Sequence, residues 1–475
     1  MIASGLRIAV AGMGRSGIAI ATEGRRRGAL PTVFDEQSAE TPSQFDAVER
    51  LQGQGIPIVT GWHGHLDAEE FDLLVASPGF RREHPAIRDM VRGGREVISE
   101  VEFAYRLAES PIVAITGTNG KSTTTALTWL LLRAAGADAV LCGNISGSGF
   151  DEVTLTEAAA MGSGKVLVAE ISSYQLEWVR DFRPRVAAIT NITPDHLDRH
   201  PNFEDYRATK LRLFARMKRD DVVVANADEP SLPMAMIESA IPPEVGLRTF
   251  SVGTSDDHDR GHAVAAQTRV EPTRLVLGGR SMSRDSLPDL GEHNAINMAM
   301  AWELATAYLG PISDAQAEAM IGAIAVFRGL EHRMEHLGIR EGVTVINNSM
   351  CTNPRAVVAS ARSRRERLHI LMGGVTKNLD FTPVAEYLAS ADHRLYLIGR
   401  AEDDLVSQLL KLGVRFDSLE QAFDAAAAAA VSGEAIVFAP GCASAYPYSN
   451  FRERGEAFRA IAEAWLKQAT APSRD

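Results

Sequence analysis

The sequence predicts an α/β protein of three domains, each built on a mainly parallel sheet. The chain has 475 residues, which is too long for one typical hydrophobic core. Short apolar, β-branched runs alternate with helix-like runs, the pattern of βαβ units. Glycine-rich turns follow several of the apolar runs, as at the strand ends of doubly wound sheets. We therefore expect a Rossmann-like domain over 1–109, a central P-loop domain over 110–327 and a second Rossmann-like domain over 328–475.

The first domain is predicted from five strand-like runs and the helical spacing between them. A helix is expected from Ser16 to Arg27, after the first glycine turn. The expected strands are LRIAVAG, PTVFD, IPIVTG, LLVASPG and EVISE, each ending at a turn or a polar residue.

The second and third domains repeat this alternation. A new series of strands opens at Ile112 and includes VLVAEISS, VAAITNI and DVVVANADE. Residues 253–289 are polar and glycine-rich, which predicts a small antiparallel patch, and a helix is expected over 292–309. The third domain shows VTVINNS, LHILMGG, RLYLIGR, VRFDS and EAIVFAPG as strand candidates, with an ordinary helix at the alanine run from Ala425.

Charge and cysteine content limit the class of protein. The formal net charge of -12 argues against nucleic acid or an anionic membrane as the main partner. Three separated cysteines predict neither a disulfide framework nor a zinc finger. The N-terminus has no signal-peptide pattern, and the apolar runs are shorter than a bilayer span. We expect a soluble, cytoplasmic protein, monomeric and without a membrane partner.

The first glycine loop is GMGRSG, from Gly12 to Gly17, after the first strand. With Asp35 closing the next strand, it fits a dinucleotide fingerprint. Three interpretations remain open: NAD binding, binding of another diphosphate such as the UDP part of a nucleotide sugar, or a tight turn without a ligand.

The second glycine loop, TGTNGKST, predicts ATP chemistry. It departs from the strict GxxxxGK[ST] spacing because Ile115 stands where the first glycine belongs. Lys121 is placed to meet the β- and γ-phosphates, and Ser122 to hold Mg²⁺. A third loop, GGVTK at Gly373 to Lys377, could contact an anion but is more often a plain turn.

Polar residues follow the next strands of the central domain. Glu170 ends one strand, His196 follows another together with Asp195 and Asp198, and Lys210 lies on an expected helix. Because the carboxyl ends of parallel strands share one crevice, Ser122, Glu170 and His196 can converge on the γ-phosphate region as Mg²⁺ ligands.

These motifs, in this order over nearly the whole chain, resemble the Mur ligase family of ATP-dependent amide ligases. The segments that carry the resemblance are TGTNGKST, GNISG, AEISSYQLE, NITPDHLDRH, YRATKLRLF, GEHNAIN and FRGLEHRME. The SPGF at Ser77 and the wording SSYQLE most resemble the branch that joins D-glutamate to UDP-N-acetylmuramoyl-L-alanine in peptidoglycan precursor synthesis. The resemblance implies an acyl phosphate formed with ATP and two Mg²⁺ ions, then displaced by the amine of the incoming amino acid.

The resemblance also implies roles for single residues. Lys121, Glu170, His196 and Lys210 match catalytic positions, and Lys210 matches a lysine that is carbamylated in these enzymes to become a metal ligand beside Ser122, Glu170 and His196. The ATP contacts are expected from Gly117, Thr118, Asn119, Gly120, Lys121, Ser122, Thr123, Asn294 and Arg333. The UDP-linked substrate is expected at Arg15, Ser16, Asp35, Ser77, Gly79 and Asn144, and the incoming amino acid at Thr352, Lys377, Ser444 and Phe451.

One segment departs from the family pattern. Where the branch has Asp-Asp-Ser-Lys-Ala-Thr-Asn, this chain has NNSMCTN from Asn347 to Asn353, which replaces an acid near the nucleotide and a lysine near its phosphates. Three alternatives stay open: an ordinary D-glutamate ligase that tolerates this drift, a ligase with a different amino acid such as L-glutamate or with altered nucleotide affinity, or a binding or regulatory relative without turnover. Among other ligases, one like folylpolyglutamate synthase is the nearest rival. An oxidoreductase would leave the second glycine loop and the carboxylate and histidine residues after it unexplained. A simple NTPase would hydrolyse nucleotide without an amino acid.

Overall fold

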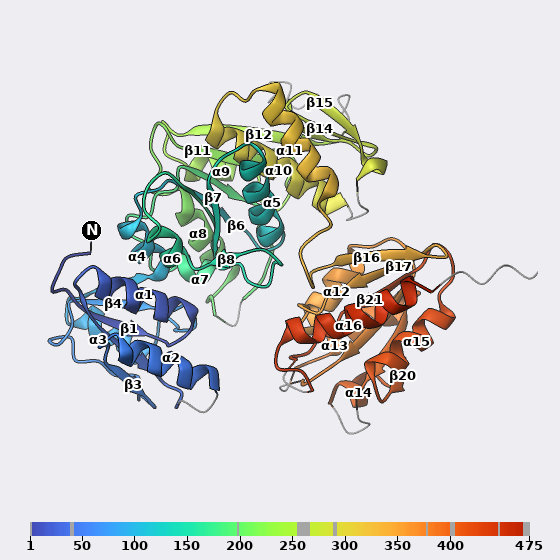
Figure 1. Cartoon of the computed structure of the whole chain (residues 1–475), viewed down its shortest axis with the longest axis horizontal. Coiled ribbons are helices and arrows are strands. Elements are labelled where there is room, and N and C mark those ends of the chain that lie inside the picture. The colour runs from blue at the N-terminus through green and yellow to red at the C-terminus, as the bar shows by residue number, and fades with distance from the viewer. Residues whose placement is uncertain are drawn as a thin grey trace, which may run out of the picture. The chain divides into compact units, whose positions relative to one another are not determined.

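The computed structural model describes residues 2–38, 42–196, 199–253, 267–287, 292–376, 379–399, 404–444 and 447–468. They form three sheets flanked by helices, the predicted fold class (Figure 1). The chain divides into two compact units. The first consists of Met1–Ser146, Phe150–Ser286 and Asn294–Ala325, and the second of Gly147–Gly149, Leu287–His293 and Val326–Asp475.

The N-terminal sheet has five parallel strands in the order β3-β2-β1-β4-β5. All five correspond to predicted strands: β1 (Arg7–Ala11), β2 (Leu30–Asp35), β3 (Ile58–Thr60), β4 (Leu73–Ala76) and β5 (Glu96–Ser99). The helices of this part are α1 (Arg15–Arg26), α2 (Pro42–Gly53), α3 (Pro85–Arg92) and α4 (Glu100–Leu107). The strand order reverses at β1, so the turns after β1, β2 and β4 share one end of the sheet.

The central sheet has ten strands in the order β15-β14-β13-β12-β11-β10-β6-β9-β7-β8. Its parallel strands are β6 (Ile112–Thr116), β7 (Ala139–Gly143), β8 (Glu152–Val153), β9 (Val166–Glu170), β10 (Val186–Ile189), β11 (Val222–Asn226), β12 (Gly246–Val252) and β13 (Arg269–Val270). The predicted antiparallel patch is β13 with β14 (Arg274–Leu277) and β15 (Arg280–Ser283). β10 and β9 flank β6, so the turns after all three strands lie together.

Helices connect and cover the central strands. They are α5 (Lys121–Ala134), α6 (Leu155–Ala159), α7 (Ser173–Leu176), α8 (Phe203–Leu211), α9 (Met234–Ala240), α10 (Glu292–Leu309) and α11 (Asp314–Val326), with short 3-10 turns at Arg212–Phe214 and Arg284–Ser286. The predicted helix over 292–309 is α10, and α5 begins within the second glycine loop, at Lys121.

A shared core joins the N-terminal and central sheets into one unit. Ile8 and Val75 of the first sheet, Phe103 of α4 and Ile112 and Leu167 of the central sheet belong to a single cluster of buried apolar residues. The opposite face of the N-terminal sheet has a separate aromatic core around Phe34, Trp62 and Phe71. Burial on both faces explains why these strands read as continuous apolar runs.

The second unit contains a six-stranded sheet in the order β16-β17-β21-β18-β19-β20, in which only β16 is antiparallel to its neighbour. The strands are β16 (Glu335–Arg340), β17 (Val343–Asn347), β18 (Leu368–Gly373), β19 (Arg394–Ile398), β20 (Gly413–Phe416) and β21 (Ala435–Phe438), and β16 was not predicted. The helices are α12 (Pro354–Arg362), α13 (Thr382–Ser390), α14 (Asp404–Leu409), α15 (Leu419–Ala429) and α16 (Phe451–Leu466).

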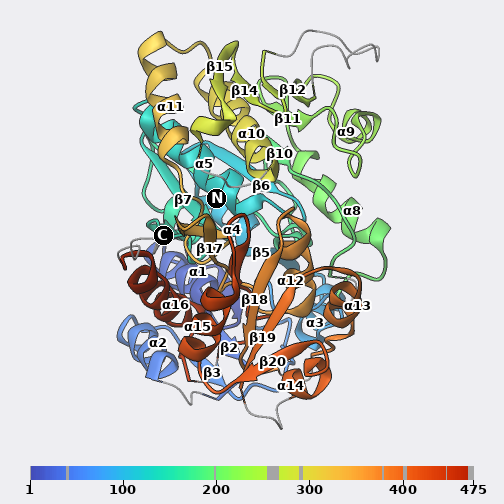
Figure 2. The same cartoon turned by 90° about the vertical axis from the view of Figure 1, so that its right-hand side faces the viewer.

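Helices cover both faces of this sheet (Figure 2). Ile370 and Val437 pack in the cluster formed with α12, α13 and α14. Their strand neighbours Leu371 and Ile436 pack in the other cluster, with α15 and α16. This alternation along single strands is the two-residue period of a doubly covered sheet. The alanine run lies in α15, as predicted.

None of the described helices is long and apolar enough to cross a membrane. The three cysteines, Cys142, Cys351 and Cys442, are free and buried, in line with the expectation that the chain has no disulfide framework. Burial raises the pKa of the Cys351 thiol to about 12.

Two buried glutamates reinforce the junction between α4 and the central sheet. Glu102 is fully buried and accepts backbone N–H bonds of 2.8–3.0 Å from Arg180, Asp181 and Phe182 through Oε2. Its Oε1 accepts from Nε of Arg106 at 3.0 Å. On the same helix, Glu100 binds the backbone and hydroxyl groups of Thr156, and burial raises the pKa of Glu100.

The Glu102→Ala variant should be clearly less stable than the parent chain. Removing the carboxylate leaves three backbone N–H groups without their acceptor, which costs at least about 2 kcal/mol. The expected result is a fall of several degrees in the thermal unfolding midpoint of the first unit, followed by circular dichroism. Glu49→Ala, at an exposed position of α2, is the control and should leave the midpoint in place. Equal midpoints for both variants would refute the role of Glu102.

Candidate active site

The second glycine loop joins β6 to α5 and is shaped by two glycines. Gly117 has φ +146°, and a Cβ there would lie 1.9 Å from Oγ1 of Thr190. Gly120 precedes α5 with φ +81°. Thr190, just after β10, donates from its hydroxyl to the carbonyl of Asn119 at 2.6 Å and holds the loop from the neighbouring strand. The loop therefore leads into a helix N-terminus, whose unpaired N–H groups and dipole favour an anion such as phosphate.

Ser122 and Glu170 meet at the ends of the adjacent strands β6 and β9. The Ser122 hydroxyl donates to Oε2 of Glu170 at 2.5 Å, and Asn144 donates to Oε1 at 2.8 Å. Glu170 is only 3% exposed. The structure thus brings together Ser122 and Glu170, two of the three residues that the sequence predicted to converge, and adds Asn144 to them.

Lys121 and Lys210 both donate hydrogen bonds to carbonyl groups of the second glycine loop. Lys121 Nζ donates to the carbonyl of Thr118 at 2.9 Å. Lys210, on α8, is 1% exposed, and its Nζ donates to the carbonyl of Gly117 at 2.7 Å and lies 4.7 Å from the ring centre of Tyr206. Burial, and after it the charge of Lys121, lowers the pKa of Lys210 well below its usual range.

His196 is presented on the loop after β10. Its backbone has φ +52°, an uncommon conformation for a residue other than glycine. Nδ1 of its ring lies 2.8 Å from the hydroxyl of Tyr174, and Nε2 lies 3.5 Å from a carboxylate oxygen of Asp195. If Nδ1 carries the proton and donates to Tyr174, Nε2 is the ring nitrogen that carries the lone pair, the form in which histidine binds metals. Asp198, which the sequence placed beside His196, lies outside the described residues.

Two arginines that the sequence did not single out connect this site to the N-terminal sheet. Arg199 donates to the carbonyls of Pro78 and Phe80 at 2.6 Å, pairs with Glu177 at 2.7 Å and stacks 4.2 Å over the ring of Tyr174.

Arg82, in the segment after β4, forms the second link. It donates to Asp205 at 2.8 Å and to the hydroxyl of Thr209 at 3.0 Å, both on the helix that carries Lys210. A hydrophobic pattern could not reveal either arginine, because their partners across this junction lie 119 to 127 residues away in the sequence.

Asn294 joins the same loop through Asn297. Asn294 is buried and accepts from the side chain of Asn297 at 3.1 Å. Oδ1 of Asn297 accepts from the hydroxyl of Thr124 on α5 at 3.2 Å and would lie 2.6 Å from a Cβ placed on Gly120. Thr118 donates to the carbonyl of Thr193 at 3.1 Å, whereas Thr123 is half-buried at the start of α5.

The first glycine loop forms a second cluster at the switch point of the N-terminal sheet. Asp35 accepts from the backbone N–H of Met13 at 2.7 Å and so closes the loop. The hydroxyl of Ser77 is buried and has no hydrogen-bond partner among the described residues, and it would lie 2.9 Å from a Cβ on Gly12. Gly79, two residues after Ser77, is exposed, and Ser16 lies in the first turn of α1. Arg15 is exposed and donates to the carbonyl of Glu152 at 3.3 Å. The unsatisfied Ser77 hydroxyl fits a polar ligand.

In the second unit, the predicted residues lie at or near the carboxyl ends of neighbouring strands. Arg333 contacts the sulfur of Met350 at 3.2 Å. Thr352 is exposed, whereas Ser444 and Phe451 are half-buried, the latter at the start of α16. Lys377 lies outside the described residues.

The neutral segment after β17 is tied into the fold by its amides. Asn347 is fully buried, and its Nδ2 lies 3.0 Å from Nδ1 of His332 and 3.2 Å from Oε2 of Glu335. Nδ2 of Asn348 donates to Ser360 at 2.7 Å, and its Oδ1 accepts from the N–H of Met334 at 3.2 Å. An ionised aspartate has no hydrogen to donate to Glu335 or Ser360. The amide groups of Asn347 and Asn348 therefore stabilise this segment in a way that aspartates could not.

The donor set at Ser122 and Glu170 fits a hard divalent cation. A hydroxyl and a buried carboxylate face each other beside a phosphate-type loop, and Glu170 has no ion-pair partner within 4 Å among the described residues. Oxygen ligands of this kind suit Mg²⁺. His332, Glu331 and Glu456 in the second unit also lie close enough to share an ion, but Arg459 already pairs with both glutamates.

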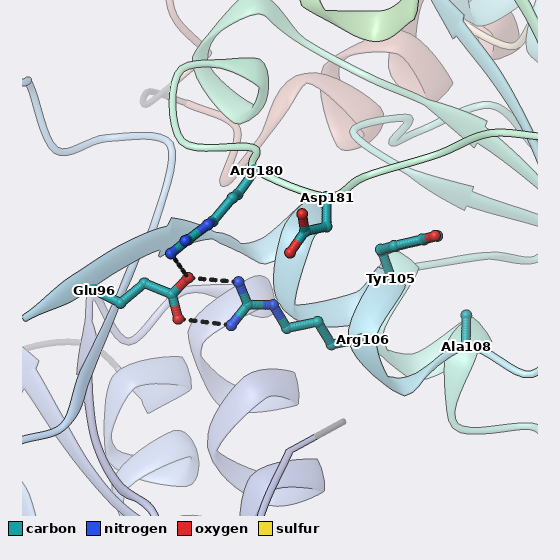
Figure 3. A pocket seen from close by; sticks show the side chains of 6 residues that line it. All are labelled: Glu96, Tyr105, Arg106, Ala108, Arg180 and Asp181. Carbon is teal, nitrogen blue, oxygen red and sulfur yellow. Dashed lines mark hydrogen bonds and ion pairs between the residues drawn. The ribbon is translucent and has the colours of Figure 1, made fainter. Parts of the chain in front are cut away.

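A separate pocket of about 620 Å³ lies beside α4 (Figure 3). The side chains of Arg106 and Arg180 both point to Glu96, with ion pairs of 2.7 and 3.0 Å. Tyr105, Ala108 and Asp181 complete its lining. It shares no lining residue with the loops described above.

Comparisons with known proteins cover the whole chain. Three family models match: "Mur ligase MurD-like, N-terminal domain" over residues 6–99, "Mur ligase middle domain" over 115–305, and "Mur ligase, glutamate ligase domain" over 332–442. A UDP-N-acetylmuramoylalanine--D-glutamate ligase of Koribacter versatilis is 33% identical over 470 residues, 98% of each chain. One of Geobacter metallireducens is 34% identical over 463 residues, 97% of this chain and 98% of that one.

Solved structures share the fold. A pseudomurein peptide ligase type C from Methanothermus fervidus superimposes with a TM-score of 0.51 at 19% identity, covering 97% of this chain and all of that chain. A MurF ligase from Thermotoga maritima in complex with ADP gives a TM-score of 0.51 at 15% identity, covering 98% of this chain and 96% of that one.

Removing the Tyr174 hydroxyl should weaken cation binding at His196. Tyr174→Phe keeps the ring under Arg199 but deletes the group that orients the imidazole, and losses of this kind lower metal affinity by about 10- to 100-fold. Binding of Mn²⁺ in the presence of an ATP analogue, followed by electron paramagnetic resonance, measures the change. Tyr105→Phe, in the separate pocket, is the control. Unchanged Mn²⁺ affinity in Tyr174→Phe would show that Tyr174 does not orient His196.

Proposed function

The chain belongs to the Mur ligase family, and we propose that it joins D-glutamate to UDP-N-acetylmuramoyl-L-alanine with ATP, in the synthesis of peptidoglycan precursors. The observation that carries this proposal is full-length similarity, at about a third identity, to ligases named for this reaction. The convergence of Ser122, Glu170 and Lys210 on one phosphate-type loop supports it.

ATP is required because a carboxylate cannot lose oxide to an attacking amine. Transfer of the γ-phosphoryl group to the substrate carboxylate creates an acyl phosphate, from which the amine displaces phosphate and leaves an amide. The chain's task is to align the two anions and offset their charge. Lys121 and the N-terminus of α5 contribute positive charge, with the contacts of Gly117, Thr118, Asn119, Gly120 and Thr123 around the phosphates.

Mg²⁺ at this site would offset phosphate charge, and we assign two ions to it. Ser122, Glu170 and His196 would hold them, together with Lys210 once it carries a carbamate. Asn294 and Arg333 are assigned to the nucleotide, and Arg15, Ser16, Asp35, Ser77, Gly79 and Asn144 to the UDP-linked substrate. Thr352, Lys377, Ser444 and Phe451 are assigned to the incoming amino acid.

Three functional parts follow from these assignments. Residues 1–109 would bind the UDP end, 110–327 would bind ATP, and 328–475 would bind the amino acid and close over ATP to exclude water from the acyl phosphate. We place the enzyme in the cytoplasm as a monomer, with no nucleic-acid or membrane partner.

Phosphate release tests the reaction directly. With ATP, Mg²⁺ and UDP-N-acetylmuramoyl-L-alanine present, D-glutamate should stimulate release more than any other amino acid in a panel of D- and L-forms. Lys121→Ala should remove this activity at unchanged secondary structure. Stimulation by L-glutamate alone would replace the proposed amino acid, and release without any amino acid would indicate a simple NTPase.

Carbamylation of Lys210 has its own test. Burial lowers the pKa of Lys210 and so favours its neutral amine, whose lone pair can attack CO₂ to form an N–C bond with loss of one proton. In ¹³C-bicarbonate, the protein should show a carbamate carbon signal that is absent from Lys210→Arg. Lys218→Arg, at an exposed lysine, should keep the signal. A signal that survives in Lys210→Arg would place the carbamate elsewhere.

A further inference from the structure

Arg454 is a buried cation at the ligand edge of the second sheet. It lies on α16, is 2% exposed, and reaches back to the loops that follow β17 and β21. These strands and β18 are neighbours in the order β17-β21-β18, and open α/β sheets bind ligands at the carboxyl ends of such strands.

The guanidinium is held by neutral groups alone. Nε donates to the hydroxyl of Ser349 at 3.1 Å and Nη2 to the Ser349 carbonyl at 2.8 Å. Nη1 donates to the carbonyl of Cys442 at 2.9 Å. Among the described residues, no carboxylate lies within 4 Å of Arg454, and its side chain has more donor hydrogens than these three bonds use.

The third glycine loop leaves room for the guanidinium of Arg454 because Gly374 has no side chain. Gly374 has φ +132°, and a Cβ there would lie 3.0 Å from Nη1 of Arg454 and 2.6 Å from the carbonyl of Ala443. Val375 pairs with Ala443 through backbone hydrogen bonds of 3.0 Å in both directions. The loop that the sequence offered as a plain turn therefore encloses the arginine, together with the Ser349 and Cys442 segments.

An unpaired buried charge is costly, and proteins keep such charges mainly where a ligand balances them. Burial lowers the pKa of Arg454 to about 10, so the group remains a cation at neutral pH. The N-terminus of α16 adds positive potential at the same place. The local field therefore favours an anion.

On the basis of the proposed function, we propose that Arg454 balances the carboxylates of the incoming amino acid and thereby sets the preference for an acidic one. It acts as a positioning residue through the two loops it joins, because Ser349 precedes Thr352 and Cys442 precedes Ser444. The Ser349 hydroxyl, which accepts from Arg454, also donates to the carbonyl of Phe451 at 2.8 Å. Arg454 thus connects three of the residues assigned to the amino acid.

Steady-state kinetics of charge-removing and charge-keeping variants test the inference. Arg454→Met should raise the KM for D-glutamate at least about tenfold while the KM values for ATP and the UDP-linked substrate stay unchanged. Preference for D-glutamate over D-glutamine should fall with it. Arg454→Lys should recover part of the lost affinity, because it restores the charge without the fork geometry. Arg415→Met, on β20, is the matched control and should behave as the parent.

The kinetic results distinguish a role for the positive charge of Arg454 from a purely structural role. Ser349→Ala removes one acceptor of Arg454 but keeps the cation and its bond to the Ser349 carbonyl, so its KM for D-glutamate should rise much less than that of Arg454→Met. Equal losses in Arg454→Met, Arg454→Lys and Ser349→Ala, or a parallel rise in the KM for ATP, would overturn the proposal in favour of a structural clamp. If Arg454→Met does not fold, Arg454→Lys and Ser349→Ala decide alone. Absence of any amino-acid dependence in the parent would instead refute the proposed function.

Discussion

The short hydrogen bond between Ser122 and Glu170 joins the ends of two neighbouring strands of the central sheet, and the surrounding loops are arranged around it. Glu170 is a buried carboxyl group with hydrogen-bond donors on both oxygens. Lys210, on α8, donates to the Gly117 carbonyl of the second glycine loop, and burial lowers its pKa. Buried ionisable groups that lie this close to a glycine loop are typical of functional sites. Both groups contact the phosphate-type loop or the helix that follows it.

The positions of His196 and Lys210 depend on the N-terminal sheet as well as on the central sheet. Arg199 and Arg82 fasten the loop after β4 to the segments that carry His196 and Lys210, and the apolar core is continuous across both sheets. We therefore expect a displacement of the backbone at Ser77 to shift Tyr174 and His196 through these direct contacts. The two sheets of the first unit act as one support for both substrate-side and phosphate-side residues.

Much of this arrangement was accessible from the sequence, because strand-end residues in parallel sheets must share an edge. Ser122, Glu170 and His196 were predicted to converge on that ground, and a hydrogen bond joins the first two. The five strands of the first sheet appear where the apolar runs placed them. Arg199, Glu102 and Arg454 were not predicted, since their roles depend on partners distant in the chain. The antiparallel β16 was also missed, because EHLGIR has no clear alternation. The segment from Asn347 to Asn353 was interpreted as the loss of one acid and one lysine. The part that the amide donors of Asn347 and Asn348 take in a buried hydrogen-bond network is revealed only by the fold.

The continuous core of the first unit limits how the chain can be divided into fragments. A cut near Glu109 would strip Phe103 and Leu107 of their partners across the two sheets and expose an apolar face on each piece. Such faces associate with one another and promote aggregation. The sheet of residues 335–438, by contrast, has helices and a closed core on each side within its own unit. Gene fragments intended for crystallisation or domain exchange should therefore keep the first two sheets together and may separate only the third.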